Sequence, residues 1–142
     1  DRAKIEQDFI AAARFLKSHE LSNNHLGAVG FCFGGYVVNM LAATLGDELD
    51  AGVPFYGTPA AKEIRKNISA PLVIQLAELD KRVNASWPEY QADLDAAGVD
   101  YTVHKYAKAN HGFHNDSTGR YDEQQAELAW GRTLELFNKH LS

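Results

Sequence analysis

The chain of 142 residues has a single cysteine, Cys32, so it cannot form an internal disulfide bond. This cysteine content is compatible with a reducing compartment and favours a cytoplasmic location. No apolar run approaches the roughly 20 residues that span a bilayer. The charged, helix-like opening DRAKIEQDF predicts that no signal peptide is present. These absences argue against a disulfide-stabilised secreted domain and against a membrane-spanning protein.

Basic residues are too few and too dispersed to suggest a nucleic-acid surface. The 14 Lys and Arg residues are scattered among 19 Asp and Glu residues, and the formal net charge is -5 at pH 7. This balance argues against binding to nucleic acid or to an anionic membrane surface. Hydrophobic residues make up 45% of the chain, so it has enough apolar material for the core of one domain.

Apolar periodicity predicts helices and strands in alternation. Helices are expected over residues 1–18, 36–49, 86–98 and 123–141, with a short helical connection over 61–69. Strands are expected at 26–31, 51–57, 71–80 and 100–107, the first two fully buried. The helix over 86–98 is expected to open with a Ser-x-x-Glu cap at Ser86, with Pro88 in its first turn. Strands separated by helices imply parallel β-α units, so the sequence predicts one α/β domain, or part of one, over residues 1–142.

The cysteine lies in a glycine-lined turn between a predicted strand and a predicted helix. The segment GFCFGG, residues 30–35, has the Gly-x-nucleophile-x-Gly shape of the nucleophile elbow, with Cys32 in place of the usual serine. Such a turn would raise the sulfur above the carboxyl end of the sheet and direct the Phe33 N–H at a developing oxyanion. The helix N-terminus would favour the thiolate. A buried structural cysteine is the alternative interpretation.

A thiol nucleophile requires a base, and the base requires an orienting group. In chains with a nucleophile elbow, the acid and then the histidine follow the nucleophile. Asp80, at the end of the predicted strand over 71–80, is the favoured acid, and Glu78 competes with it. His111 lies in the loop after the last strand and is the favoured base, with His114 as its rival.

The sequence gives little support for a metal site, a phosphate or dinucleotide site, or a dithiol redox site. His111 and His114 could also be interpreted as a metal site, but no third ligand lies at a useful spacing, so no metal is expected. The chain has no Gly-Lys-Ser/Thr phosphate loop, and the glycines around Cys32 do not follow the dinucleotide-binding pattern. A single cysteine also excludes a Cys-x-x-Cys redox pair.

Four segments together resemble the dienelactone hydrolase family: GFCFGGY, the acid of AELD, the NHGFH loop and the closing YDEQQAELAWGRTLELFNKHL. The resemblance covers essentially the whole chain, and its specific part is the cysteine elbow. It implies an α/β-hydrolase fold and the opening of 4-carboxymethylenebut-2-en-4-olide, a lactone, without metal or organic cofactor. It also implies a triad with Cys32 as nucleophile, Asp80 as orienting acid and His111 as general base and acid. Phe33 would supply one oxyanion N–H.

The chain departs from the family in two ways. Dienelactone-active members have an arginine four residues after the catalytic histidine to hold the substrate carboxylate. Here that position is Asn115, although Arg82 and Arg120 are nearby in sequence. Members also carry a longer N-terminal part, with the first strands, the loop for the second oxyanion donor and a glutamate linked to thiol activation.

The sequence is therefore expected to be the C-terminal part of the fold, with the N-terminal strands absent. The predicted strand over 26–31 would then lack a partner on one side. Open strand edges recruit other strands, and this run has neither charge nor proline to protect it. The expected partner is a separate N-terminal segment of the same protein, or a second copy of the chain.

Three functions are weighed for this sequence. The leading hypothesis is a hydrolase of small-molecule esters or lactones that works through an acyl-enzyme on Cys32. The second is a non-catalytic α/β fragment that retains the elbow. The third is a redox-sensitive thiol protein, because an exposed cysteine of low pKa is readily oxidised.

Overall fold

Four parallel strands form the centre of the molecule, and they lie side by side in the order in which they occur in the chain. The strands are β1 (Gly27–Phe31), β2 (Ala51–Phe55), β3 (Leu72–Ala77) and β4 (Tyr101–Tyr106). The α-helices are α1 (Arg2–Ser18), α2 (Phe33–Leu45), α3 (Lys81–Ala96) and α4 (Glu123–His140), with 3-10 helices at Gly46–Glu48 and Lys62–Asn67. This computed structural model describes all residues, 1–142. The α/β class and the parallel order predicted from the sequence are confirmed.

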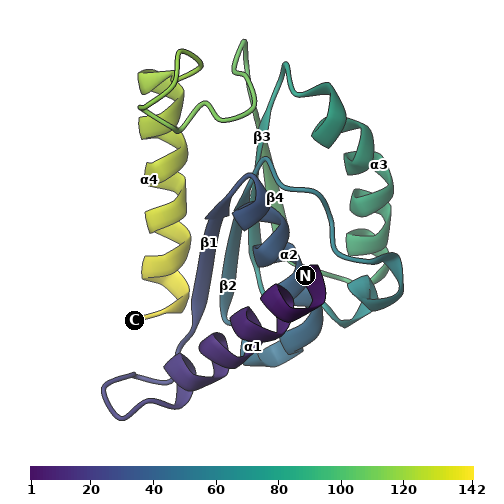
Figure 1. Ribbon diagram of the computed structural model, residues 1–142, viewed down its shortest axis with the longest axis vertical. Coiled ribbons are helices and arrows are strands. Elements are labelled where there is room, and N and C mark those ends of the chain that lie inside the picture. The colour runs from purple at the N-terminus through teal and green to yellow at the C-terminus, as the bar shows by residue number, and fades with distance from the viewer.

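The helices form a layer on each face of the sheet (Figure 1). Helix α4 covers one face, and α1, α2 and α3 cover the other. The side chains of β3 alternate between the two cores: Leu72, Ile74 and Leu76 point to one, Val73 and Ala77 to the other. Burial on both faces explains the continuous apolar sequence of β2 and β3. None of the helices combines the length and the hydropathy needed to cross a bilayer.

Strand β1 is less buried than the sequence predicts. Val29 and Phe31 keep 37% and 36% of their surface exposed. The reason is topological, because β1 pairs with β2 on one side and has no strand on the other. The expectation of a fully buried strand at 26–31 is therefore wrong, whereas every residue of β2 is buried as expected.

Helix α3 begins at Lys81 rather than at the expected Ser86 cap. Its N-cap is Asp80, whose carboxylate accepts a hydrogen bond from the Val83 N–H at 3.2 Å. Ser86 lies inside the helix and donates to the Val83 carbonyl, and Pro88 is also internal. An aspartate caps as well as a serine and also interacts favourably with the helix dipole. The cap predicted at Ser86 is therefore wrong.

The turn before α2 is fixed by close backbone contact with the end of β2. The Cys32 N–H donates to the Phe55 carbonyl at 3.1 Å. A Cβ atom on Gly35 would lie 2.5 Å from that same oxygen, and one on Gly57 would lie 2.3 Å from the Gly35 carbonyl carbon. Only glycine allows two backbone segments to approach this closely. This contact sets the position of Cys32 relative to β2.

Two neighbouring glycines allow this contact to be tested. We expect Gly35→Ala to lower the free energy of unfolding by about 1–3 kcal/mol, because the added methyl group meets backbone atoms that cannot rotate away. Gly34→Ala is the matched control, since an added Cβ meets no atom within 4 Å. In a helix this change should be neutral or stabilising by up to about 1 kcal/mol. Urea denaturation of both variants measures the difference, and equal losses would contradict the contact.

Candidate active site

The carboxyl ends of all four strands lie at one edge of the sheet. The register pairs Phe31 with Phe55, Phe55 with Gln75, and Ala77 with Tyr106. The first residues beyond the strands therefore meet above this edge, which is where open α/β sheets bind their ligands. Each strand is followed there by one residue of chemical interest: Cys32 after β1, Tyr56 after β2, Asp80 after β3 and His111 after β4.

Cys32 is the N-cap of α2 and is exposed to solvent. Its φ angle of 56° lies in the left-handed region, which costs backbone strain for a residue other than glycine. The N–H groups in the first turn of a helix lack intrahelical acceptors, and the N–H of Phe33 finds none elsewhere in the chain. The turn thus presents a thiol next to an unoccupied backbone donor.

Asp80 and His111 form a hydrogen-bonded pair. His111 Nδ1 lies 2.5 Å from Asp80 Oδ2. The Asp80 side chain is only 5% exposed, and its other oxygen caps α3 through the Val83 N–H. A carboxylate at Nδ1 places the imidazole proton on that nitrogen and leaves Nε2 with a free lone pair. The pair is arranged so that Nε2 can accept a proton.

The two competing residues have other partners. Glu78 is exposed, and its carboxylate accepts the Lys108 N–H at 2.6 Å, which holds the turn after β4. The His114 ring packs among aromatic rings, 4.9 Å from Phe31 and 5.2 Å from Phe55 between centroids. Burial lowers the pKa of His114, and no carboxylate binds its ring. The structure therefore pairs Asp80, rather than Glu78, with His111, rather than His114.

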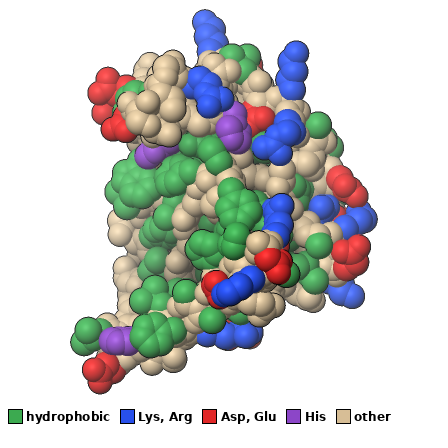
Figure 2. Space-filling view, viewed as in Figure 1, with side chains coloured by type: hydrophobic (Ala, Val, Ile, Leu, Met, Phe, Trp, Pro, Cys, Tyr) green, Lys and Arg blue, Asp and Glu red, His purple; other side chains and the backbone are tan.

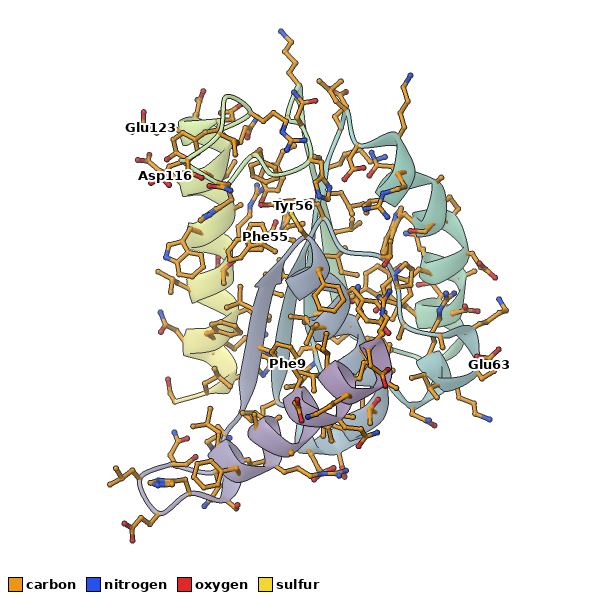
Figure 3. The ribbon with its side chains drawn as sticks, viewed as in Figure 1. Phe9, Phe55, Tyr56, Glu63, Asp116 and Glu123 are labelled. Carbon is orange, nitrogen blue, oxygen red and sulfur yellow. The ribbon has the colours of Figure 1, made fainter.

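Tyr56 belongs to this site but was not found from the sequence. Its side chain is buried, its φ angle is 36°, and its ring lies 5.0 Å from that of His111. Figure 3 shows Phe55 and Tyr56 at the end of the sheet nearest the loop that carries Asp116. A hollow of about 300 Å³ opens here, lined by Phe31, Cys32, Tyr56, His114, Asn115 and Asp116. The only sequence feature that could have indicated Tyr56 is its position at the end of a strand that is predicted to be buried.

The electrostatic setting of the thiol differs from the expectation. Although the Cys32 side chain reaches solvent, its partial burial raises the pKa of the thiol, and the charge of Asp80 raises it further. Arg120 and Arg82 lower the pKa but do not reverse the shift. The sequence predicts a thiolate favoured by the helix terminus, whereas the net shift of the Cys32 pKa is upward, because loss of hydration outweighs the nearby positive charges.

No group of three or more His, Cys, Asp and Glu residues is arranged to hold a metal ion. His111 points to Asp80, and His114 lies in the aromatic cluster. The two histidine rings therefore have different neighbours.

The reactivity of Cys32 should follow this charge pattern. We expect iodoacetamide to alkylate Cys32 at pH 7 more slowly than a free cysteine, because a raised pKa reduces the thiolate fraction. The midpoint of the rate against pH should rise further in Arg120→Gln, which removes a positive charge. It should fall in Asp80→Asn, which removes a negative charge and keeps a residue that can cap α3. Shifts of the opposite sign would contradict these assignments.

Comparison with known proteins identifies a family and several similar proteins. A family model described as the dienelactone hydrolase family matches residues 1–141. "Protein usf" of Aquifex pyrophilus is 34% identical over 143 residues, which cover 98% of this chain and 62% of that protein. The carboxymethylenebutenolidase of Pseudomonas putida is 30% identical over 133 residues, which cover 91% of this chain and 55% of that protein.

Solved structures share the fold. A crystal structure of a candidate dienelactone hydrolase from Klebsiella pneumoniae matches with a TM-score of 0.85 and 25% identity, over 97% of this chain and 62% of that one. The dienelactone hydrolase of Anabaena variabilis matches with a TM-score of 0.79 at 19% identity, over all of this chain and 62% of that one. The chain thus spans about three fifths of the length of these similar proteins.

Proposed function

The chain belongs to the dienelactone hydrolase family, and we propose that it carries the reaction centre of an ester or lactone hydrolase. The observation that supports this most directly is the 2.5 Å hydrogen bond between His111 and the buried Asp80, together with a cysteine in a strained elbow turn that is close enough for the Asp80 charge to raise its pKa. Histidine oriented by a carboxylate is the arrangement that activates a nucleophile of this kind.

In the proposed acylation step, Cys32 Sγ attacks the carbonyl carbon of the ester. The thiol proton moves to His111 Nε2, and the carbonyl oxygen becomes an oxyanion. Asp80 stabilises the imidazolium through Nδ1, and the Phe33 N–H donates to the oxyanion. The tetrahedral intermediate then collapses: the carbon–oxygen bond to the leaving group breaks, and His111 returns the proton to that oxygen. The product is a thioester on Cys32.

Deacylation uses the same groups in reverse roles. His111 Nε2 takes a proton from a water molecule, whose oxygen attacks the thioester carbon. The carbon–sulfur bond breaks, the sulfur recovers the proton, and the acid leaves. In a lactone the leaving alcohol stays joined to the acyl group, so the product is a single hydroxy acid, which can rearrange to its keto form where the alcohol is an enol.

The raised pKa of Cys32 affects how this reaction starts. A thiol that is mostly protonated at neutral pH must lose its proton as the substrate is attacked, so the reaction requires proton transfer to His111. The same pKa direction weakens the redox-sensor alternative, since oxidation depends on the thiolate. The non-catalytic alternative is decided by the assays below.

Removing the nucleophile tests the proposal directly. With the protein in the form in which it occurs, including any further segment it carries, hydrolysis of p-nitrophenyl acetate and of 4-carboxymethylenebut-2-en-4-olide is followed by absorbance. We expect Cys32→Ala to reduce both rates to the uncatalysed level, and Cys32→Ser to retain a trace. Unchanged turnover in Cys32→Ala would overturn the assignment, and a folded wild type that hydrolyses neither compound would favour the non-catalytic alternative.

The two loop histidines provide a second test. We expect His111→Ala to lower kcat by about 10²–10⁴-fold, the usual value of a general base. His114→Ala removes a ring of the same type from the same loop, but one that packs against Phe31 and Phe55. It should act mainly on KM or on stability. Steady-state kinetics of the two variants measures this, and the reverse ranking would assign the base to His114.

A further inference from the structure

The two long sides of helix α4 border different surfaces. On the side of β1, hydrophobic side chains gather between α4 and α1 (Figure 2). On the side of β4, a hollow of about 310 Å³ opens between the helix and the sheet. We call it the β4–α4 hollow, and it shares no lining residue with the hollow beside Cys32. Three elements line it: Val73 of β3, Thr102 and His104 of β4, and Arg132, Glu135, Leu136 and Lys139 of α4.

The walls of this hollow follow from strand register and helix spacing. Strands β3 and β4 pair Val73 with Thr102 and Gln75 with His104. Residues two apart in a strand point to the same face, so Tyr106 faces α4 as His104 does. The four lining residues of α4 are three or four apart and therefore lie on one side of the helix. The hollow thus runs along the strands and is separate from the candidate active site at their carboxyl ends.

Buried polar groups hold Arg132 in place. Its Nη1 group donates to the Tyr106 hydroxyl at 3.2 Å, and its Cζ atom lies 5.5 Å from the centre of the Tyr106 ring. The Tyr106 hydroxyl donates to Gln75 Oε1 at 2.6 Å, and Gln75 Nε2 donates to the Ala129 carbonyl at 3.1 Å. Tyr106 and Gln75 are only 3% and 0% exposed. Because such deeply buried groups have fixed partners, this network orients the guanidinium.

Most of the hydrogen-bonding capacity of Arg132 is unused within the chain. A guanidinium has five N–H donors in a planar fork, and the bond to Tyr106 uses one of them. Neither Arg132 nor Lys139 forms a salt bridge, although Glu135 has the spacing from Lys139 that favours one. The hollow therefore carries two unpaired cations and one carboxylate, so one positive charge is left uncompensated.

We propose that the β4–α4 hollow binds a small organic monocarboxylate. The fork of Arg132 binds the carboxylate through two parallel N–H···O bonds, and Lys139 adds a second positive charge. Val73 and Leu136 contact the apolar body of the ligand. The volume is at the lower end of the range for small-molecule sites, which suits a ligand the size of a substituted benzoate. The single uncompensated charge favours such a monoanion over a phosphate dianion.

His104 makes this binding depend on pH. Burial and the charge of Arg132 lower the pKa of His104, so the ring is mainly neutral at pH 7 without a ligand. Tyr106 on the same strand and Arg132, Glu135 and Lys139 of α4 are the titratable groups that face it. A bound carboxylate stabilises the protonated ring and raises its pKa. By linkage, the affinity is lowest above the pKa of the bound form and rises as the pH falls below it.

Fluorine NMR with para-fluorobenzoate as the probe tests the proposal, on the protein with any further segment that it carries. The wild type should bind para-fluorobenzoate at least about tenfold more tightly than para-fluorobenzamide, which has nearly the same shape and no charge. The affinity for the acid should increase between about pH 8 and about pH 5.5, as His104 takes up a proton. Neither measurement needs a variant or the chemistry of Cys32, so this test and the hydrolase assays can fail separately.

Charge-removing variants locate the probe. Arg132→Gln should weaken binding at least about tenfold, because the charge-assisted hydrogen bonds to the carboxylate are lost. Lys105→Gln is the matched control, since it removes the same charge from an exposed position of β4 that points away from α4. Arg120→Gln removes a charge that acts on the thiol of the candidate active site. Both should leave binding unchanged, and thermal melts establish that the variants are folded.

Four results would overturn the proposal. The first is an affinity for the acid that is absent or no higher than for the amide. The second is equal weakening by Arg132→Gln and Lys105→Gln. The third is a loss of binding in Arg120→Gln but not in Arg132→Gln, which would place the probe in the candidate active site. The fourth is tighter binding of inorganic phosphate than of para-fluorobenzoate, which would assign the hollow to a phosphate ligand. A pH dependence that persists in His104→Gln would remove His104 from the site.

Discussion

Parallel hydrogen bonding from β1 to β4 brings the carboxyl ends of four strands to one edge of the sheet, and the candidate site depends on this alignment. Cys32, Tyr56, Asp80 and His111 are far apart in the chain and meet only because each follows one of these ends. Close backbone contacts at glycines then set the position of the elbow turn against the end of β2. A sheet with another strand order would separate the four residues, whatever their individual conformations.

The carboxylate of Asp80 joins the site to the scaffold. One oxygen caps α3 and the other binds His111, so the helix and the imidazole are positioned by the same buried group. A buried carboxylate is costly unless its oxygens are satisfied, and here both are. The position of His111 is thereby tied to the fold of β3 and α3 rather than to the loop that carries it.

The interior of the molecule is well packed, but the edge of the sheet at β1 is partly exposed. β2 and β3 are buried on both faces and β4 carries charge, while β1 leaves Val29 and Phe31 partly open between two apolar helix stripes. The sequence predicts the strand itself but assigns it full burial, since a short apolar run looks the same in a sheet centre and at an edge. Only the number of neighbouring strands distinguishes the two, and that is a property of the assembled sheet.

The sequence by itself determined the α/β class, the order of helices and strands, and the glycine turn at Cys32. Helices and strands follow from the local periodicity of apolar residues, and the turn follows from glycine, which adopts backbone angles that other residues avoid. The tertiary structure alone decided that Asp80 rather than Glu78 meets His111, that Tyr56 lies beside them, and that burial raises the pKa of Cys32. It also moved the start of α3 to Lys81. The contacts of a side chain and its loss of hydration depend on which distant segments of the chain come together, and local periodicity does not indicate this.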